Sequence, residues 1–154
     1  MTSIKQDFGI ALRPPYLQEL SRNKNLNIDF LEIMTEDFLW TGGLSHQYLK
    51  KIANNYKIVL HGVSLGIANS TPLNWQYLKQ LKKLANNYNS IWISDHICLT
   101  GTNKQNIYDL MPLPYNKETL NYVSNRIIQV QDFLEQNILL ENISAYLLFK
   151  ESTM

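Results

Sequence analysis

The chain has 154 residues, within the usual size of one domain, and 45% of them are hydrophobic, which is ordinary for a globular protein. Its 14 basic and 13 acidic residues nearly cancel to a net charge of +1 with no basic stripe, so we expect no nucleic acid and no anionic membrane as a partner. No segment reaches the ~20 apolar residues of a membrane span, and the single cysteine excludes an internal disulfide, so we predict a soluble protein of the reducing cytoplasm.

Short apolar segments bounded by polar residues or glycine predict buried strands. Between them, longer segments repeat apolar residues at the i, i+3, i+4, i+7 spacing of an amphipathic helix. The expected strands are residues 8–12, 29–34, 57–63, 90–97 and 137–140, and the expected helices are residues 16–22, 49–56, 75–88 and 120–134.

Asn74 and Asn116 precede the last two expected helices at the position of an N-cap. The regular alternation of strands and helices predicts a parallel sheet with right-handed crossovers. No GxGxxG turn follows the first strand, which argues against a dinucleotide-binding Rossmann domain. Two α/β architectures remain open: a complete five-stranded open sheet, or a TIM-type (β/α)8 barrel truncated after its fifth strand, because a closed barrel takes eight units and roughly 250 residues.

Metal-competent side chains occupy the carboxyl ends of successive expected strands, where α/β proteins concentrate their functional residues. Glu32 and Glu36 close the second strand, His61 the third, His96 the fourth and Glu141 the fifth. Two histidines and one carboxylate form the facial ligand set of non-haem iron, and the same donors also bind zinc. A single strand-end histidine is more often a hydrogen-bonded structural residue, so the metal hypothesis depends on the coincidence of all three.

Alternation of side chains along a strand places His61 on the same face as Val59 and Val63, and His96 on the same face as Ser94. Asp95 is then expected to face the helix layer or the rim of the sheet. Two further residues are expected to carry no chemistry: His46 in a polar loop as solvated surface, and Cys98 as an inert packing residue.

Several segments together resemble the multinuclear non-haem iron-dependent oxidative enzymes, the family that includes the iron subunit of methanobactin biosynthesis. The resemblance covers essentially the whole chain in order. The segments are GIALRPPY (9–16), FLEIMTEDF (30–38), LHGVSLGI (60–67), SDHICLTG (94–101), DLMPLPYNKETL (109–120) and LLENISAYLLF (139–149).

The family is similar to TIM-barrel metalloenzymes such as xylose isomerase and endonuclease IV. The resemblance implies two or three iron ions, and dioxygen chemistry on a residue, often cysteine, of a ribosomally made peptide that a separate partner protein presents. It implies that the segment 109–115 covers the barrel mouth. By position it assigns His61, His96 and Glu141 as iron ligands, Glu36 and Asn142 as residues that support them or line the pocket, and Arg13 as a contact for a peptide carboxylate or a phosphate-like group.

Two features depart from the family pattern. Asp95 stands where the family usually has glutamate, and the sequence stops before the strands that bring its further ligands. We therefore expect half of a barrel with a partial metal site, inactive alone or dependent on a complementary half, and an uncovered apolar face lined by Val59, Val63 and Leu139. The alternatives are a non-enzymatic remnant or scaffold, or a metal-dependent hydrolase or isomerase; the lack of a basic phosphate-binding surface argues against a nuclease.

Overall fold

The computed structural model describes residues 6–22, 26–101, 106–144, 147 and 149–153. Its main sheet is entirely parallel and its strands lie in chain order, as the alternation of elements predicted. The sheet contains β1 (Gly9–Leu12), β2 (Phe30–Met34), β3 (Lys57–His61), β4 (Trp92–Ile97) and β7 (Ile138–Asn142).

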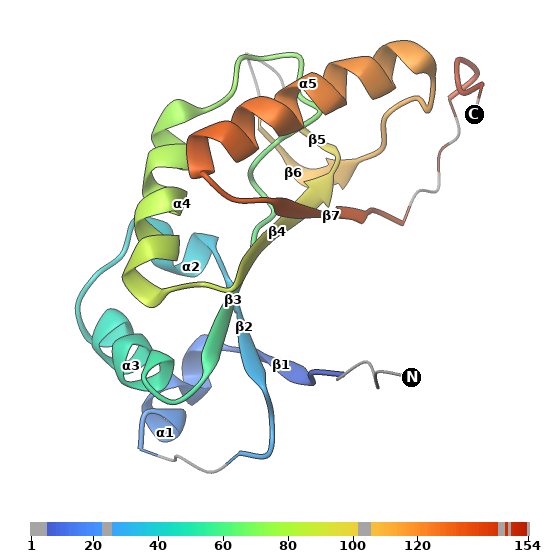
Figure 1. The fold of residues 1–154 in the computed structure, drawn as a ribbon. Helices are drawn as coiled ribbons and strands as arrows, with labels where there is room; N and C mark the ends of the chain where they lie inside the picture. The colour runs from blue at the N-terminus through green and yellow to red at the C-terminus, as the bar shows by residue number, and fades with distance from the viewer. Residues whose placement is uncertain (1–5, 23–25, 102–105, 145–146, 148, 154) are drawn as a thin grey trace, which may run out of the picture.

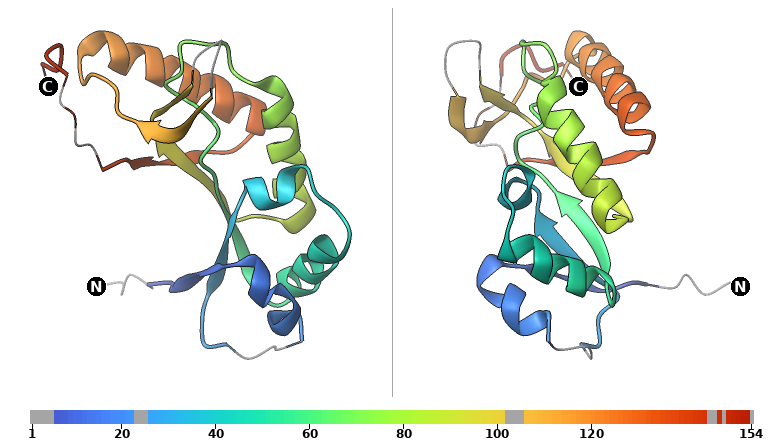
Figure 2. Two further views of the ribbon diagram at one scale, coloured as in Figure 1. Left: turned by 180° about the vertical axis from the view of Figure 1, so that it is seen from behind. Right: turned by 90° about the vertical axis from the view of Figure 1, so that its left-hand side faces the viewer.

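Helices follow the strands and gather on one side of the twisted sheet (Figure 1). Figure 2 shows the same layering from behind and from the side. The helical elements are η1 (Pro14–Tyr16), α1 (Leu17–Leu20), α2 (Glu36–Leu39), α3 (Leu44–Ala53), α4 (Trp75–Tyr88) and α5 (Lys117–Leu134).

The core lies between the helices and one face of the sheet. The strands contribute alternate residues to it, including Leu31, Ile33, Ile58 and Leu60, all at most 1% exposed. The helices contribute their apolar stripes, and burying these matched faces stabilises the layer arrangement. The same alternation sends the intervening strand residues to the opposite face, where the polar candidates lie.

Both expected helix caps are confirmed. Asn74 accepts a hydrogen bond from Tyr77 N at 3.0 Å at the start of α4, and Asn116 accepts one from Thr119 N at 2.9 Å at the start of α5. These bonds satisfy backbone donors that have no partner inside the helix, so they fix where each helix begins.

Three features differ from the sequence prediction. The short helix α2 directly follows β2, α3 covers residues 44–53 instead of 49–56, and an antiparallel hairpin of β5 (Leu99–Gly101) and β6 (Asn106–Met111) follows β4. The expected loop 109–115 therefore begins inside a strand. Tyr56 lies beyond the end of α3, where its hydroxyl accepts a hydrogen bond from Leu26 N at 2.9 Å instead of continuing the helical stripe.

The parallel sheet with one helical layer is compatible with part of a TIM-type barrel. Among the described residues, β1 and β7 lie at opposite edges and each pairs on one side only. The face opposite the helices is not uniformly open, in contrast to the prediction. Val59 is only 1% exposed, whereas Leu139 is 52% exposed. None of the helices in the described ranges has both the length and the apolar character needed to cross a membrane.

The burial of Cys98 predicts that its thiol is inert. The residue is 0% exposed, and burial together with the neighbouring Asp95 charge raises its pKa to about 12. We expect no reaction of the native chain with a disulfide-exchange reagent such as dithionitrobenzoate, and one equivalent after denaturation, because only the thiolate attacks. Leu139→Cys, at an exposed position on the same sheet, provides the matched control and should react at once; a native wild-type chain that reacts equally fast would contradict the burial.

The open strand edges and exposed Leu139 predict self-association. Unpaired edges recruit other chains and exposed apolar side chains strengthen such contacts. We expect the isolated chain to dimerise or aggregate in light scattering, and Leu139→Lys to shift it toward monomer. Leu44→Lys, which replaces a leucine that is 64% exposed on α3, should have no such effect. A monodisperse wild-type monomer with cooperative denaturant unfolding would show instead that these strands form a self-sufficient domain.

Candidate metal centre

The register of the sheet places His61, His96 and Glu141 on one face at the carboxyl ends of three neighbouring strands. His96 of β4 pairs with Glu141 of β7, and His61 of β3 pairs with Ser94, which precedes His96 by two residues. Residues two apart share a face of a strand. The structure therefore brings together the three residues that the sequence singled out.

The distances within this set suit one metal ion. Nε2 of His61 and Nε2 of His96 each lie 3.7 Å from Oε2 of Glu141, and the ligand atoms of all three residues lie within 4.8 Å of one another. Two ligands on one ion with bonds of ~2.1 Å lie at most about 4.2 Å apart. Both carboxylate–imidazole separations meet this limit, and no separation within the set is greater than 4.8 Å.

Hydrogen bonds on the other ring nitrogens set the tautomer of both histidines. Nδ1 of His96 lies 3.2 Å from the Gly62 carbonyl oxygen, which can only accept, so this nitrogen carries the proton. Nδ1 of His61 lies 2.8 Å from Oγ of Ser94, whose hydroxyl donates to the Leu60 carbonyl at 3.3 Å, so the serine accepts from the histidine. In the neutral form of each ring, Nε2 is therefore the nitrogen with the free lone pair, which is the form that binds a metal.

The set is buried on the histidine side and open on the carboxylate side. The side chains of His61 and His96 are 15% and 11% exposed, whereas that of Glu141 is 60% exposed. Three ligands leave coordination positions on the solvent side of the ion for further ligands or substrate, as catalytic metal sites require.

Asp95 faces the helix layer, as the alternation along β4 predicted. Its side chain is 2% exposed and accepts hydrogen bonds from the backbone N–H groups of His96 at 2.7 Å and Leu65 at 3.1 Å. Burial raises the pKa of Asp95 to about 7; the two N–H groups oppose that shift, and the nearby Glu36 carboxylate adds to it. The same surroundings, burial first and then the two carboxylates, raise the pKa of Tyr77.

Glu36 reaches this region from a different element than the sequence suggested. The strand β2 ends at Met34, so Glu36 does not share a strand face with Glu32 and lies instead in the first turn of α2. Its Oε1 accepts hydrogen bonds from Val63 N at 3.1 Å and from the Tyr77 hydroxyl at 2.9 Å. Glu36 therefore contacts the segment that follows His61.

Asn142 and Arg13 lie outside the convergent set. Asn142 is exposed at the end of β7, and strand alternation directs it to the face opposite Glu141. Arg13 is exposed directly after β1, and β2 lies between that strand and the strand of His61. The two residues share only the end of the sheet with the candidate site, so their predicted roles stay hypotheses.

The interpretation of His46 as solvated surface is wrong. The residue lies in the first turn of α3 and is half-buried, with Nδ1 2.6 Å from the Tyr88 hydroxyl and Nε2 3.1 Å from the Phe38 carbonyl. No local pattern indicates this contact, because Tyr88 is 42 residues away along the chain. His46 joins α3 to α4 and does not approach the candidate metal centre.

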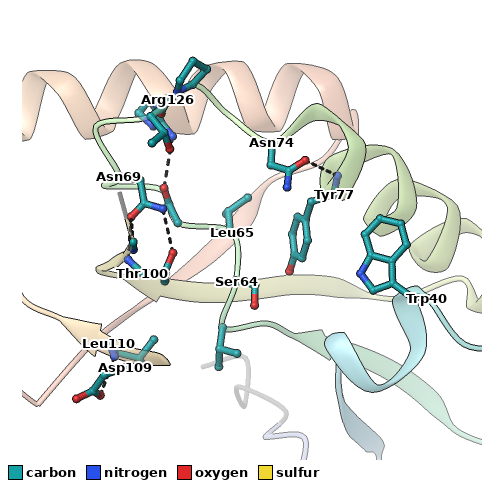
Figure 3. Close-up of a pocket in the computed structure, with 15 residues that line it drawn as sticks. Trp40, Ser64, Leu65, Asn69, Asn74, Tyr77, Thr100, Asp109, Leu110 and Arg126 are labelled. Atoms are coloured by element: carbon teal, nitrogen blue, oxygen red, sulfur yellow. Dashed lines mark hydrogen bonds between the residues drawn. The ribbon is translucent and has the colours of Figure 1, made fainter. Parts of the chain in front are cut away.

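A pocket of about 640 Å³ is lined by the segment that follows β3, together with residues from the helix side of the sheet (Figure 3). Its walls are the segment after His61, the start of α4, Trp40, Arg126 of α5, and the hairpin strands, which contribute Thr100 and Asp109. The three metal-site residues are not among those that line it. A pocket of this size can hold a small ligand or a short stretch of peptide.

Sequence reasoning missed two contributors to this region. Arg126 stands in the apolar stripe of α5 between Val123 and Val130, and this break in the pattern was an available signal for a buried charge with a specific task. It is 8% exposed and donates to the carbonyls of Thr71 at 2.9 Å and Gly66 at 3.4 Å. The hairpin was signalled by the glycine and asparagine between the apolar segments on either side of residues 101–105.

Comparison with known proteins gives concordant results. The chain is 36% identical over 147 residues to a UPF0276 protein of Caulobacter vibrioides. The aligned region covers 96% of this chain and 52% of the relative. It is 41% identical over 154 residues to a UPF0276 protein of Acaryochloris marina. Here the aligned region covers 100% of this chain and 55% of the relative. The chain thus spans about half the length of the curated relatives it matches.

A family model described as RiPP precursor modification enzyme MbnB/TglH/ChrH matches residues 7–154. The match extends over nearly the whole chain and confirms the resemblance to the iron-dependent oxidative enzymes. This chain belongs to the MbnB/TglH/ChrH family.

Proposed function

We propose that this chain contributes part of the iron centre of an enzyme that uses dioxygen to modify a residue, often cysteine, in a ribosomally made peptide. The observation that carries the proposal is the convergence of two imidazole Nε2 atoms on one carboxylate oxygen, each 3.7 Å away. This donor set fits iron(II), which accepts two histidines and one carboxylate and keeps open positions. A bound iron(II) ion would supply Lewis acidity and the electrons for chemistry with dioxygen.

In this proposal the residues of the chain act by holding and orienting. His61 and His96 present neutral Nε2 atoms because Ser94 and the Gly62 carbonyl engage their Nδ1–H groups. Glu141 provides negative charge that compensates the charge of the metal. Its side chain is 60% exposed, so a peptide and further ligands approach the site from this side. The adjacent pocket of about 640 Å³ is the candidate seat for part of the peptide.

The remaining ligands in this proposal come from the part of the fold that the longer relatives possess. The chain covers 52% and 55% of two of those relatives, and three protein ligands hold one ion but not a multinuclear cluster. A peptide-presenting partner protein and a complementary half accordingly belong to the proposed complete enzyme. The zinc-dependent hydrolase or isomerase alternative uses the same donors and is distinguished by the metal that the site retains.

Removal of either histidine should weaken iron binding. We expect His61→Ala and His96→Ala each to lower iron(II) affinity by more than about tenfold, since even loss of a residue that only supports a ligand typically costs 10–100-fold. The measurement is anaerobic equilibrium dialysis followed by elemental analysis, with circular dichroism to verify folding.

The third histidine gives a matched control. His46→Gln should retain wild-type iron content, because His46 contacts Tyr88 and Phe38 instead of the site. Equal iron content in the wild type and in the His61→Ala/His96→Ala double variant would reject the site. Retention of zinc in strong preference to iron would favour the hydrolase or isomerase alternative.

A further inference from the structure

Two carboxylates, that of buried Asp95 and that of half-buried Glu36, lie behind the candidate metal centre on the helix side of the sheet, and neither belongs to the ligand set. We propose that Glu36 and Asp95 are positioning residues: they fix the backbone of residues 62–65, and that backbone holds His96 in the orientation a metal requires. The inference rests on the proposed function, because it concerns the same metal centre. We refer to residues 62–65 as the clamped segment.

Asp95 accepts hydrogen bonds from two backbone N–H groups, one on the metal-site strand and one on the clamped segment. One carboxylate oxygen accepts the N–H of His96 itself at 2.7 Å, and the other accepts the N–H of Leu65 at 3.1 Å. The two backbone N–H groups therefore engage different oxygens of one side chain. Asp95 therefore ties β4 at the metal ligand directly to the far end of the clamped segment.

Glu36 binds the middle of the same segment. Its Oε1 accepts the N–H of Val63 at 3.1 Å, and the Tyr77 hydroxyl, at 2.9 Å, holds that oxygen in place. Its Oε2 is buried and has no hydrogen-bond partner among the described residues. All the bonds of this side chain therefore run through one oxygen, and its second oxygen contributes none.

Gly62 transmits the constraint to the metal centre. Its N–H donates to the Ser94 carbonyl at 2.8 Å, and its carbonyl accepts Nδ1–H of His96 at 3.2 Å. A Cβ atom at this position would lie 2.5 Å from Oδ2 of Asp95 and 3.0 Å from the Tyr77 hydroxyl, so the carboxylate packs directly against the glycine backbone. Rotation of this peptide group would remove the acceptor that sets both the orientation and the tautomer of His96.

Simple anchoring of a loop does not require this arrangement. The far end of the same loop is held without carboxylates, by Arg126 on the carbonyls of Gly66 and Thr71 and by the Tyr122 hydroxyl on the Asn69 carbonyl at 2.6 Å. Placing two carboxylates in a buried region is costly, because burial disfavours charge and the two groups repel each other. The two carboxylates lie at the end of the loop nearest His96. We infer that the free-energy cost of burying them is tolerated because they place this histidine accurately.

The hydrogen-bond pattern makes the proposal testable with near-isosteric variants. Glu36→Gln keeps the single oxygen that accepts both bonds, so we expect cobalt(II) affinity within about twofold of wild type, whereas Glu36→Ala loses both bonds. Asp95→Asn keeps only one of its two acceptor oxygens, because the amide nitrogen then faces an N–H donor. We expect Glu36→Ala and Asp95→Asn to lower the affinity by about 10–100-fold, the usual effect of removing a partner that supports a ligand.

The probe is cobalt(II), titrated into the full chain and followed by visible absorption, which reports the ligand geometry as well as the affinity. Tyr122→Phe is the matched control, since it loosens the far end of the same loop and should leave both affinity and spectrum unchanged. Circular dichroism identifies any variant that fails to fold. If Glu36→Ala does not fold, Asp95→Asn and Tyr77→Phe carry the test, and loss of the Tyr77 hydroxyl should lower the affinity by releasing Glu36.

The outcomes separate this inference from the proposed function. Equal affinities and spectra in wild type, folded Glu36→Ala and Asp95→Asn would overturn the positioning role while leaving the metal site intact. A Glu36→Gln variant as weak as Glu36→Ala would also overturn it, because charge and not hydrogen bonding would then be responsible. A wild-type chain that binds cobalt(II) no better than His61→Ala would reject the metal site itself, and the positioning role with it.

Discussion

The backbone hydrogen bonds that pair β4 with β7 determine which side chains share the face opposite the helices. In the observed register His96 lies beside Glu141, and the register of β3 with β4 places His61 beside Ser94 on the same face. A slip of one residue would send every side chain of a strand to the other face and put Leu140 or Asn142 where Glu141 stands. The buried alternate residues, such as Ile93 and Ile138, prevent such a slip, so the apolar core and the polar centre depend on one register.

The segment after β3 shows a second dependence, between a loop and the side chains that hold it. Carboxylates from α2 and β4 bind its first part, and Arg126 and Tyr122 of α5 bind its second part. The loop thus has fixed backbone positions although it has no regular secondary structure. One of its sides supports His96 and the other lines the pocket, so the metal centre and the pocket share a single preorganised wall.

Membership of the MbnB/TglH/ChrH family gives this geometry its context. The family implies metal use, and His61, His96 and Glu141 form a possible metal site that is open to solvent at Glu141. Iron, dioxygen and the peptide belong to the proposed function.

The sequence by itself determined the order and approximate limits of the main strands and long helices, the caps Asn74 and Asn116, and the burial of Cys98. It also determined which three residues meet at one end of the sheet as a candidate metal site. These features follow from local periodicity and from the rule that parallel strands meet at one end of a sheet. Only the tertiary structure decided the contacts of His46, the approach of Glu36 from α2, the task of Arg126 and the hairpin that borders the pocket. These features depend on partners tens of residues away along the chain, and a hydrogen bond across that distance exists only after the core has placed both elements.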